Sequence, residues 1–314
     1  MIWIGAALLG YFFLAFSQLL DKFLLTKGRI PEPATYAFYV SLFSAFSFAF
    51  SVFGLKILPA PQMILFFVAG LIFTYSLLMF YYAVRDYDVA RVAPLQGLFT
   101  TLTVIAFSFL LPEFFSETHF HWTLLWALGL FIVGGLLISY DLPFKKTDHL
   151  PVSVILSGFL MGVYLLLLKV GYAQADFVNG LVWSRAGAFL GAFSLLLFPI
   201  FRHQIFYHQK KKAAVVNKKK NFVTLGLFIF NKTTAGVASL LIIYAISLGS
   251  TSFIQALNGM QYVFLFLLII PFQKFFPKIF TERLSWSDWA QKIAALVLIV
   301  FGFYFLSLSG IIIK

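Results

Sequence analysis

Residues 245–259 read AISLGSTSFIQALNG, and residues 83–97 read AVRDYDVARVAPLQG. Each stretch opens on an alanine and closes on a glycine at the same separation. An amide side chain directly precedes that glycine, Asn258 in one stretch and Gln96 in the other. Self-similarity over this length predicts a chain built from two structurally similar halves.

The composition places both halves in a membrane. Of the 314 residues, 61% are hydrophobic and only 11% are charged, whereas a soluble domain carries about 25% charged residues. The chain has no cysteine, so disulfides, thiolate metal sites and cysteine nucleophiles are excluded. The net charge of +12 does not indicate nucleic-acid binding, because the cations lie between apolar runs, where a membrane topology requires them.

Apolar runs of about 20 residues predict membrane-spanning helices, and the sequence has ten of them. None alternates with a period of two, so helices are favoured over a barrel. The basic stretch 201–221 is too polar to span and is predicted to be a loop. The ten predicted spans are 2–20, 35–55, 62–83, 89–111, 122–140, 151–169, 178–200, 222–246, 251–272 and 288–309.

The cationic residues predict the orientation of these helices. The loops after the odd-numbered helices hold seventeen Lys and Arg residues, and the other side holds three. Cytoplasmic loops are enriched in these residues, so both termini are predicted to lie outside. Each half, 1–146 and 147–314, has five helices. Because five is odd, the second half is predicted to be inverted relative to the first.

The chain resembles the drug/metabolite transporter superfamily, in its EamA-like branch. The matching features are the Pro94-to-Gly97 turn, the Leu257-to-Gly259 turn, and the glutamates Glu117 and Glu282 before the fifth and tenth helices. This resemblance implies a transporter of small metabolites, amino acids, nucleotide sugars or drugs. Many members carry basic residues at the N-terminus and after the second helix, where this chain has only Lys56, so the absolute orientation stays open.

Charged residues inside the spans indicate function by default. All eleven acidic residues are predicted at helix ends or in loops, which argues against exchange of a proton for a cationic drug at a buried carboxylate. Two cations are predicted to lie deep, Arg185 in the seventh helix and Lys232 in the eighth. We expect them to line a cavity and meet an anionic or zwitterionic group. In the alternative reading, Arg185 bonds backbone carbonyls or extends to the interface, and Lys232 pairs with carbonyls at a helix end.

Amide side chains add a polar stripe to the predicted ninth helix. Gln255 and Gln261 flank Asn258 at three residues on either side, so all three lie on one face. Lipid cannot satisfy this stripe, which is therefore expected to face the protein interior. Gln96 occupies the position equivalent to Asn258 in the first half. Such amides bind a substrate or join packed helices by hydrogen bonds, and both readings stay open.

The sequence therefore predicts an all-α polytopic membrane protein of two inverted five-helix repeats. The predicted function is a secondary transporter, a permease or exporter of a small anionic or zwitterionic metabolite. A cavity opening sideways to lipid would instead favour a flippase for a lipid or lipid-linked sugar, and a tightly packed polar stripe would favour a non-transporting scaffold. The residues expected to bind substrate are Lys232, Arg185, Asn258, Gln255, Gln261 and Gln96.

The remaining expectations concern chemistry, partners and location. No nucleophile with a base and no paired carboxylates are predicted at helix centres, so an enzyme is not expected, nor are catalytic residues, a metal site or a cofactor. The expected partners are a small-molecule substrate and the lipid bilayer, without nucleic acid, and homo-oligomer formation is open. The expected location is the plasma (inner) membrane, crossed several times.

Overall fold

A computed structural model describes residues 2–26, 32–87, 89–110, 122–139, 152–213, 218–249 and 257–275, together with isolated positions between 254 and 305. These residues form helices and no strand. The helices are α1 (Ile2–Thr26), α2 (Pro33–Phe43), the 3-10 helix η1 (Ser44–Phe53), α3 (Ala60–Asp86), α4 (Val89–Leu110), α5 (Trp122–Ser139), α6 (Val152–Tyr172), α7 (Phe177–Leu195), α8 (Pro199–Ala213), α9 (Lys218–Leu248) and α11 (Gly259–Phe275).

Several helices are long and apolar enough to cross a bilayer. Among the described residues, five qualify: α1, α2 with η1, α3, α6 and α9. A sixth span results if α7 and α8, which meet at a bend of 91°, are counted together, and α4 and α11 contain shorter apolar stretches. The prediction of a helical, membrane-type protein is confirmed in this coarser form.

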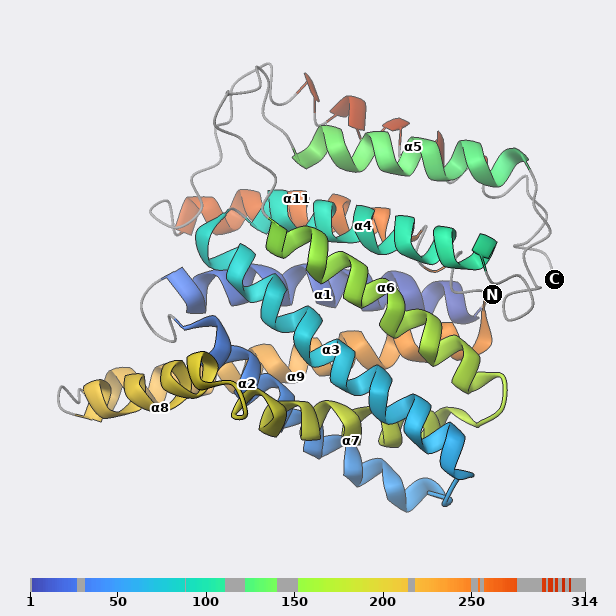
Figure 1. Cartoon of the computed structure of the whole chain (residues 1–314). Helices are drawn as coiled ribbons and strands as arrows, with labels where there is room; N and C mark the ends of the chain where they lie inside the picture. Colours follow the sequence, from blue (N-terminus) through green and yellow to red (C-terminus); the bar gives the residue numbers. More distant parts are fainter. Residues whose placement is uncertain are drawn as a thin grey trace.

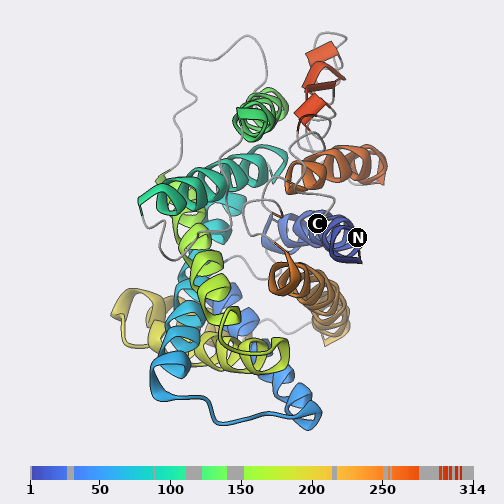
Figure 2. The ribbon, with the colours of Figure 1, turned by 90° about the vertical axis from the view of Figure 1, so that its right-hand side faces the viewer.

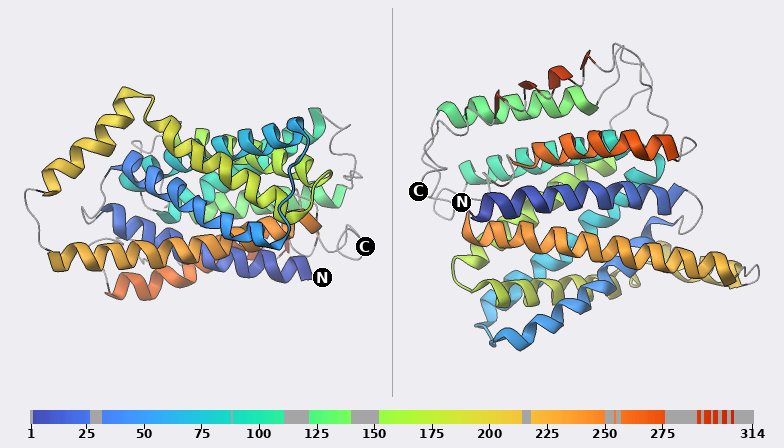
Figure 3. Two further views of the ribbon diagram at one scale, coloured as in Figure 1. Left: turned by 90° about the horizontal axis from the view of Figure 1, so that it is seen from below. Right: turned by 180° about the vertical axis from the view of Figure 1, so that it is seen from behind.

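The helices form two layers, seen side by side in Figure 2. One layer contains α11, α1 and α9, which lie next to one another in the right-hand view of Figure 3. In the other layer, α3 packs against α6 and α7, and α6 packs against α4. The last residues of α1, α3, α8 and α11 and the first residues of α9 lie at the same end of the molecule, on the left of Figure 1.

Glycine allows two helices of the second layer to touch backbone to backbone. A Cβ atom added to Gly70 of α3 would lie 2.0 Å from the carbonyl oxygen of Ser184 in α7, and one added to Gly187 would lie 2.3 Å from that of Phe67. Across the same interface, the Thr74 hydroxyl donates to the Ala188 carbonyl at 3.1 Å. Small residues commonly mediate such close helix contacts in membranes. We call this contact the glycine seam.

Two segments differ from the sequence prediction. The second span was expected as one helix over 35–55, but it changes from α2 to the 3-10 helix η1 at Ser44 and ends at Gly54, whose φ of 106° favours glycine. The basic stretch 201–221 was predicted to be a loop, and most of it is helical, in α8 and the first turns of α9. The high charge of this stretch opposes membrane crossing and does not oppose helix formation.

The close approach in the glycine seam predicts sensitivity to added volume. The Gly70→Leu substitution should destabilise the protein by about 1–3 kcal/mol, because the new side chain meets the α7 backbone. The midpoint of thermal unfolding, followed by circular dichroism in detergent, measures this loss. Gly226→Leu is the control, because a Cβ atom there meets nothing within 4 Å. Equal shifts in the two variants would contradict the seam.

Candidate functional site

A cavity of about 560 Å³ lies between the two layers. Its walls come from α1, α2, η1, α3, α4, α6, α7 and α9 and from the start of α11, so segments far apart in the sequence share one space. Most of its lining is apolar. The polar side chains among the lining residues are Tyr11, Ser17, Gln18, Asp21, Ser44, Ser47, Tyr81, Gln96, Thr100, Tyr164, Arg185, Lys232, Thr233, Ser239, Asn258 and Gln261.

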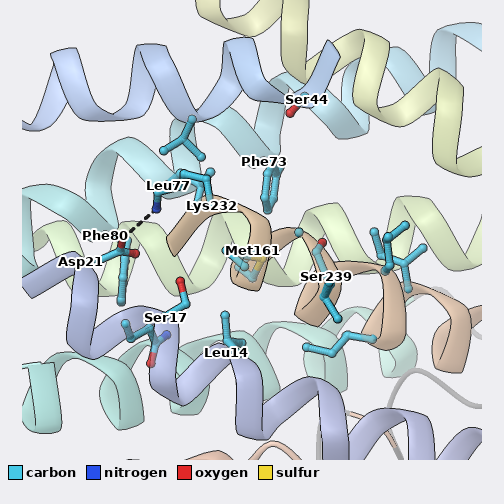
Figure 4. A pocket seen from close by; sticks show the side chains of 18 of the residues that line it. Leu14, Ser17, Asp21, Ser44, Phe73, Leu77, Phe80, Met161, Lys232 and Ser239 are labelled. Carbon is cyan, nitrogen blue, oxygen red and sulfur yellow. Dashed lines mark hydrogen bonds and ion pairs between the residues drawn. The ribbon is translucent and has the colours of Figure 1, made fainter. Parts of the chain in front are cut away.

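An ion pair marks one end of this cavity. Lys232 of α9 donates to Oδ1 of Asp21 in α1 at 2.7 Å, and both side chains are buried. Figure 4 shows this contact as a dashed line. The same oxygen accepts hydrogen bonds at 2.5 Å from the hydroxyl of Tyr36 and from the amide of Asn231. A buried ion pair is stable only when such additional hydrogen bonds satisfy its atoms.

Aromatic rings surround the ammonium group of Lys232. Its nitrogen lies 4.6 Å from the ring centroid of Tyr36 and 5.3 Å from that of Tyr81. Ring faces attract a desolvated cation and so help to hold the charge inside the protein. The Ser17 hydroxyl donates to Asn231 at 2.8 Å, which extends the hydrogen-bond network along α1.

Asp21 corrects an expectation drawn from the sequence. The first helix was predicted to end at residue 20, which placed Asp21 in a loop, but α1 continues to Thr26 and buries this carboxylate against α9. The argument against a buried carboxylate is therefore wrong. A signal was present in the sequence, because Ser17 and Gln18 lie four and three residues before Asp21 and so neighbour it on the helix surface.

Arg185 lies in the same cavity without an acidic partner among the described residues. Its guanidinium donates to the Ser239 hydroxyl of α9 and lies 4.8 Å from the ring centroid of Phe73 in α3. Only 8% of the side chain is exposed. Lys232 has a carboxylate within bonding distance, whereas the described part of the chain places none beside Arg185.

The amides expected to bind substrate also line the cavity, and each has a protein partner. Gln96 donates to Ser157 at 2.8 Å and Gln261 donates to Gln18 at 2.6 Å, so these two amides join neighbouring helices. Asn258 donates to the Tyr262 hydroxyl at 3.1 Å, one turn farther along the chain. The cavity therefore brings together Lys232, Arg185, Asn258, Gln261 and Gln96, while Gln255 lies outside the described residues.

Two further lysines hold helix ends and do not line the cavity. Lys22, at the end of α1, donates to the carbonyls of Val84 and Tyr87 at the end of α3, at 3.0 and 2.7 Å. Lys169, near the end of α6, donates to the Gly249 carbonyl just after α9, at 3.0 Å. Cations at helix C-termini complement the helix dipole. No group of three metal-ligating side chains occurs among the described residues.

The cavity has a side opening, which we define by the lining residues of η1 and α9 whose side chains are exposed. Phe46 of η1 is 72% exposed, and Ile229 and Val237 of α9 are 43% and 40% exposed. Thr233 and Gly236 lie between these two α9 residues and are also exposed. All of these residues belong to helices long and apolar enough to cross a bilayer, so the opening lies between two candidate membrane spans.

The buried ion pair predicts a distinctive pattern of stability. Asp21→Leu or Lys232→Met alone should cost about 3–5 kcal/mol, because each leaves one charge buried without its partner. The double variant Asp21→Leu with Lys232→Met should recover most of this loss. Thermal unfolding in detergent measures all three, and Arg85→Gln, which removes an exposed ion pair, should cost about 0–1 kcal/mol. Additive losses in the double variant would show that the two charges do not interact.

Comparison with known proteins shows the fold alone. No known family matches the sequence, and no curated protein matches it. One solved structure, described only as the crystal structure of a protein, is 16% identical to this chain. The match covers 98% of this chain and 95% of that one, with a TM-score of 0.64. The arrangement of helices described above therefore recurs in a protein of very different sequence.

Proposed function

We propose that this protein is a secondary transporter, a permease or exporter, in which two inverted five-helix repeats give alternating access to the cavity. The repeats correspond to residues 1–146 and 147–314. Corresponding helices make corresponding contacts: α1, which opens the first repeat, packs on α9, the third span of the second, and α6, which opens the second, packs on α3, the third span of the first. Lys22 and Lys169 bind the ends of α3 and α9 in the same way.

One pair of equivalent interfaces is unequal, as alternating access requires. The glycine seam closes α3 against α7. The equivalent pair is α9 with α2 and η1. At one end of this pair, Phe228 of α9 packs on Tyr36 of α2. Farther along α9, the cavity opens beside Gly236. A Cβ atom added to Gly236 would meet nothing within 4 Å. In this proposal, the transporter exchanges the closed and open interfaces between its two states.

The observation that carries the proposal is that Arg185 lines this cavity, buried and without a carboxylate beside it among the described residues. A buried guanidinium without a carboxylate partner among the described residues is suited to an anionic or zwitterionic substrate. Lys232 was expected to serve this purpose, and Asp21 already balances its charge. A scaffold would have its polar stripe packed tightly, whereas Asn258 and Gln261 line a cavity. We place the protein in the plasma (inner) membrane as part of the same proposal.

Uptake of labelled carboxylates, phosphates and amino acids into proteoliposomes tests this function. At least one solute should enter faster than into empty vesicles, and Arg185→Gln should slow its uptake by about tenfold or more, because a hydrogen bond to a charged group is lost. Lys232→Ala should also slow uptake, through loss of the ion pair. Arg202→Gln, on the exposed face of α8, should leave it unchanged. The proposal fails if no solute enters above background or if all variants match the wild type.

A second candidate is a flippase for a lipid or lipid-linked sugar, because the side opening lies between two candidate membrane spans, where lipid could enter it. Vesicles of phosphatidylcholine with a trace of fluorescent phosphatidylglycerol, bleached from outside by dithionite, measure lipid movement between leaflets. A flippase should expose more than the outer half of the probe to dithionite, and Gly236→Trp should slow this by filling the opening. Leu225→Trp, on an exposed part of α9 away from the cavity, is the control. Bleaching limited to half of the probe would exclude this candidate.

A further inference from the structure

We infer that Arg185, Tyr164 and Ser239 form a head-group site, and that the substrate is a monoanion with an apolar body of about 10 Å. This inference rests on the proposed transport function and narrows its substrate from the broader class of anionic and zwitterionic metabolites. It draws on a buried hydroxyl, the net charge of the cavity and the spacing of polar groups along α9.

The hydroxyl belongs to Tyr164 of α6, which lines the cavity and is only 3% exposed. Its oxygen has no hydrogen-bond partner among the described residues. The ring packs on Phe73, with centroids 4.9 Å apart, and the Arg185 guanidinium lies 4.8 Å from the same centroid. A buried hydroxyl without a partner is unfavourable. In this inference, the Tyr164 hydroxyl is a second donor to the anion that Arg185 binds, because both residues pack against Phe73.

The net charge of the cavity favours a single negative charge on the substrate. Among the described lining residues, the charged side chains are Asp21, Lys232 and Arg185. The first two neutralise each other at 2.7 Å, so the cavity carries a net charge of +1. A monoanion brings the total to zero. A zwitterion leaves an excess of +1, a cation raises it to +2 and a dianion reverses its sign, and excess charge is unfavourable away from water.

The spacing along α9 sets the length of the apolar body. Ser239, which binds Arg185, lies seven residues after Lys232, or about 10 Å at 1.5 Å per residue. In Figure 4, Leu14, Phe73 and Met161 lie between Ser239 and the Asp21–Lys232 pair. The site thus has a cationic end, an apolar middle and a neutral polar end. A chain of about eight carbons with one terminal anion fits this order.

A set of eight-carbon compounds with different charges tests the inference. Radiolabelled octanoate is bound to the full chain in phosphatidylcholine nanodiscs, and binding to empty nanodiscs is subtracted. Unlabelled octanoate should compete at least about tenfold better than each of the four analogues. Octylammonium and octanol lack the carboxylate that accepts from Arg185, while 8-aminooctanoate and the dianion suberate keep a carboxylate but leave the cavity with an excess charge. Equal competition by 8-aminooctanoate or octylammonium would overturn the inference.

Single substitutions distinguish a hydroxyl that binds the head group from a hydroxyl that is merely buried. Arg185→Gln should weaken octanoate binding by about tenfold or more, and Tyr164→Phe by about threefold to tenfold. The matched control is Tyr172→Phe, because the Tyr172 hydroxyl also lacks a partner among the described residues but does not line the cavity. If Arg185→Gln does not fold, Tyr164→Phe compared with Tyr172→Phe decides. Equal effects in the two tyrosine variants, or octanoate binding unchanged in Tyr164→Phe, would overturn the inference.

The same measurements distinguish this inference from the proposed function. Selective octanoate binding without uptake of any solute would support the head-group site and refute transport. Uptake of a cation or zwitterion that does not depend on Tyr164 would support transport and refute the site. The source of the anion is resolved by comparing uptake of free octanoate with movement of fluorescent phosphatidylglycerol in wild type and Arg185→Gln. Either process, if it requires Arg185, supports a monoanionic head group.

Discussion

The ion pair between Asp21 and Lys232 is the constraint on which the rest of the site depends. Removing two charges from water costs several kcal/mol for each ion, and only close pairing with further hydrogen bonds compensates for this cost. Tyr36 and Asn231 supply those bonds, so α1, α2 and α9 meet at one carboxylate oxygen. Because the pair is neutral overall, Arg185 determines the charge of the cavity.

The two layers close the protein on one side and leave the cavity open on the other. On one side of the cavity, the glycine seam brings α3 and α7 together without intervening side chains. On the other side, exposed residues of η1 and α9 line the cavity, among them the small residues Thr233 and Gly236. A largely apolar cavity with one unbalanced cation is suited to binding, and the unequal sides suit a change of access.

Part of this arrangement could be predicted from the sequence, because the length of an apolar run and the position of a charge within it can be read directly along the chain. The helical, apolar character of the chain was predicted, and five described helices are long and apolar enough to span a bilayer. Arg185 and Lys232 were predicted to line a cavity, and both side chains do. Asp21 was missed because the end of a helix is poorly marked when the next residues are polar. Tyr164 was missed because a tyrosine in an apolar helix gives no local sign of whether its hydroxyl has a partner. The inverted repeat, the transport function and the substrate stay predictions, and the part expected of Gln255 lies outside the described residues.

The 3-10 segment η1 has a mechanical consequence. A 3-10 helix rises about 2.0 Å per residue and has poorer hydrogen-bond geometry than an α-helix, so long runs of it are uncommon. This run covers ten residues at the edge of the cavity. Its return to α-helical geometry would shorten the segment by about 5 Å at the difference of 0.5 Å per residue. Such a shortening would shift the residues of η1 along α7, against which η1 packs, and would so alter the wall beside the opening.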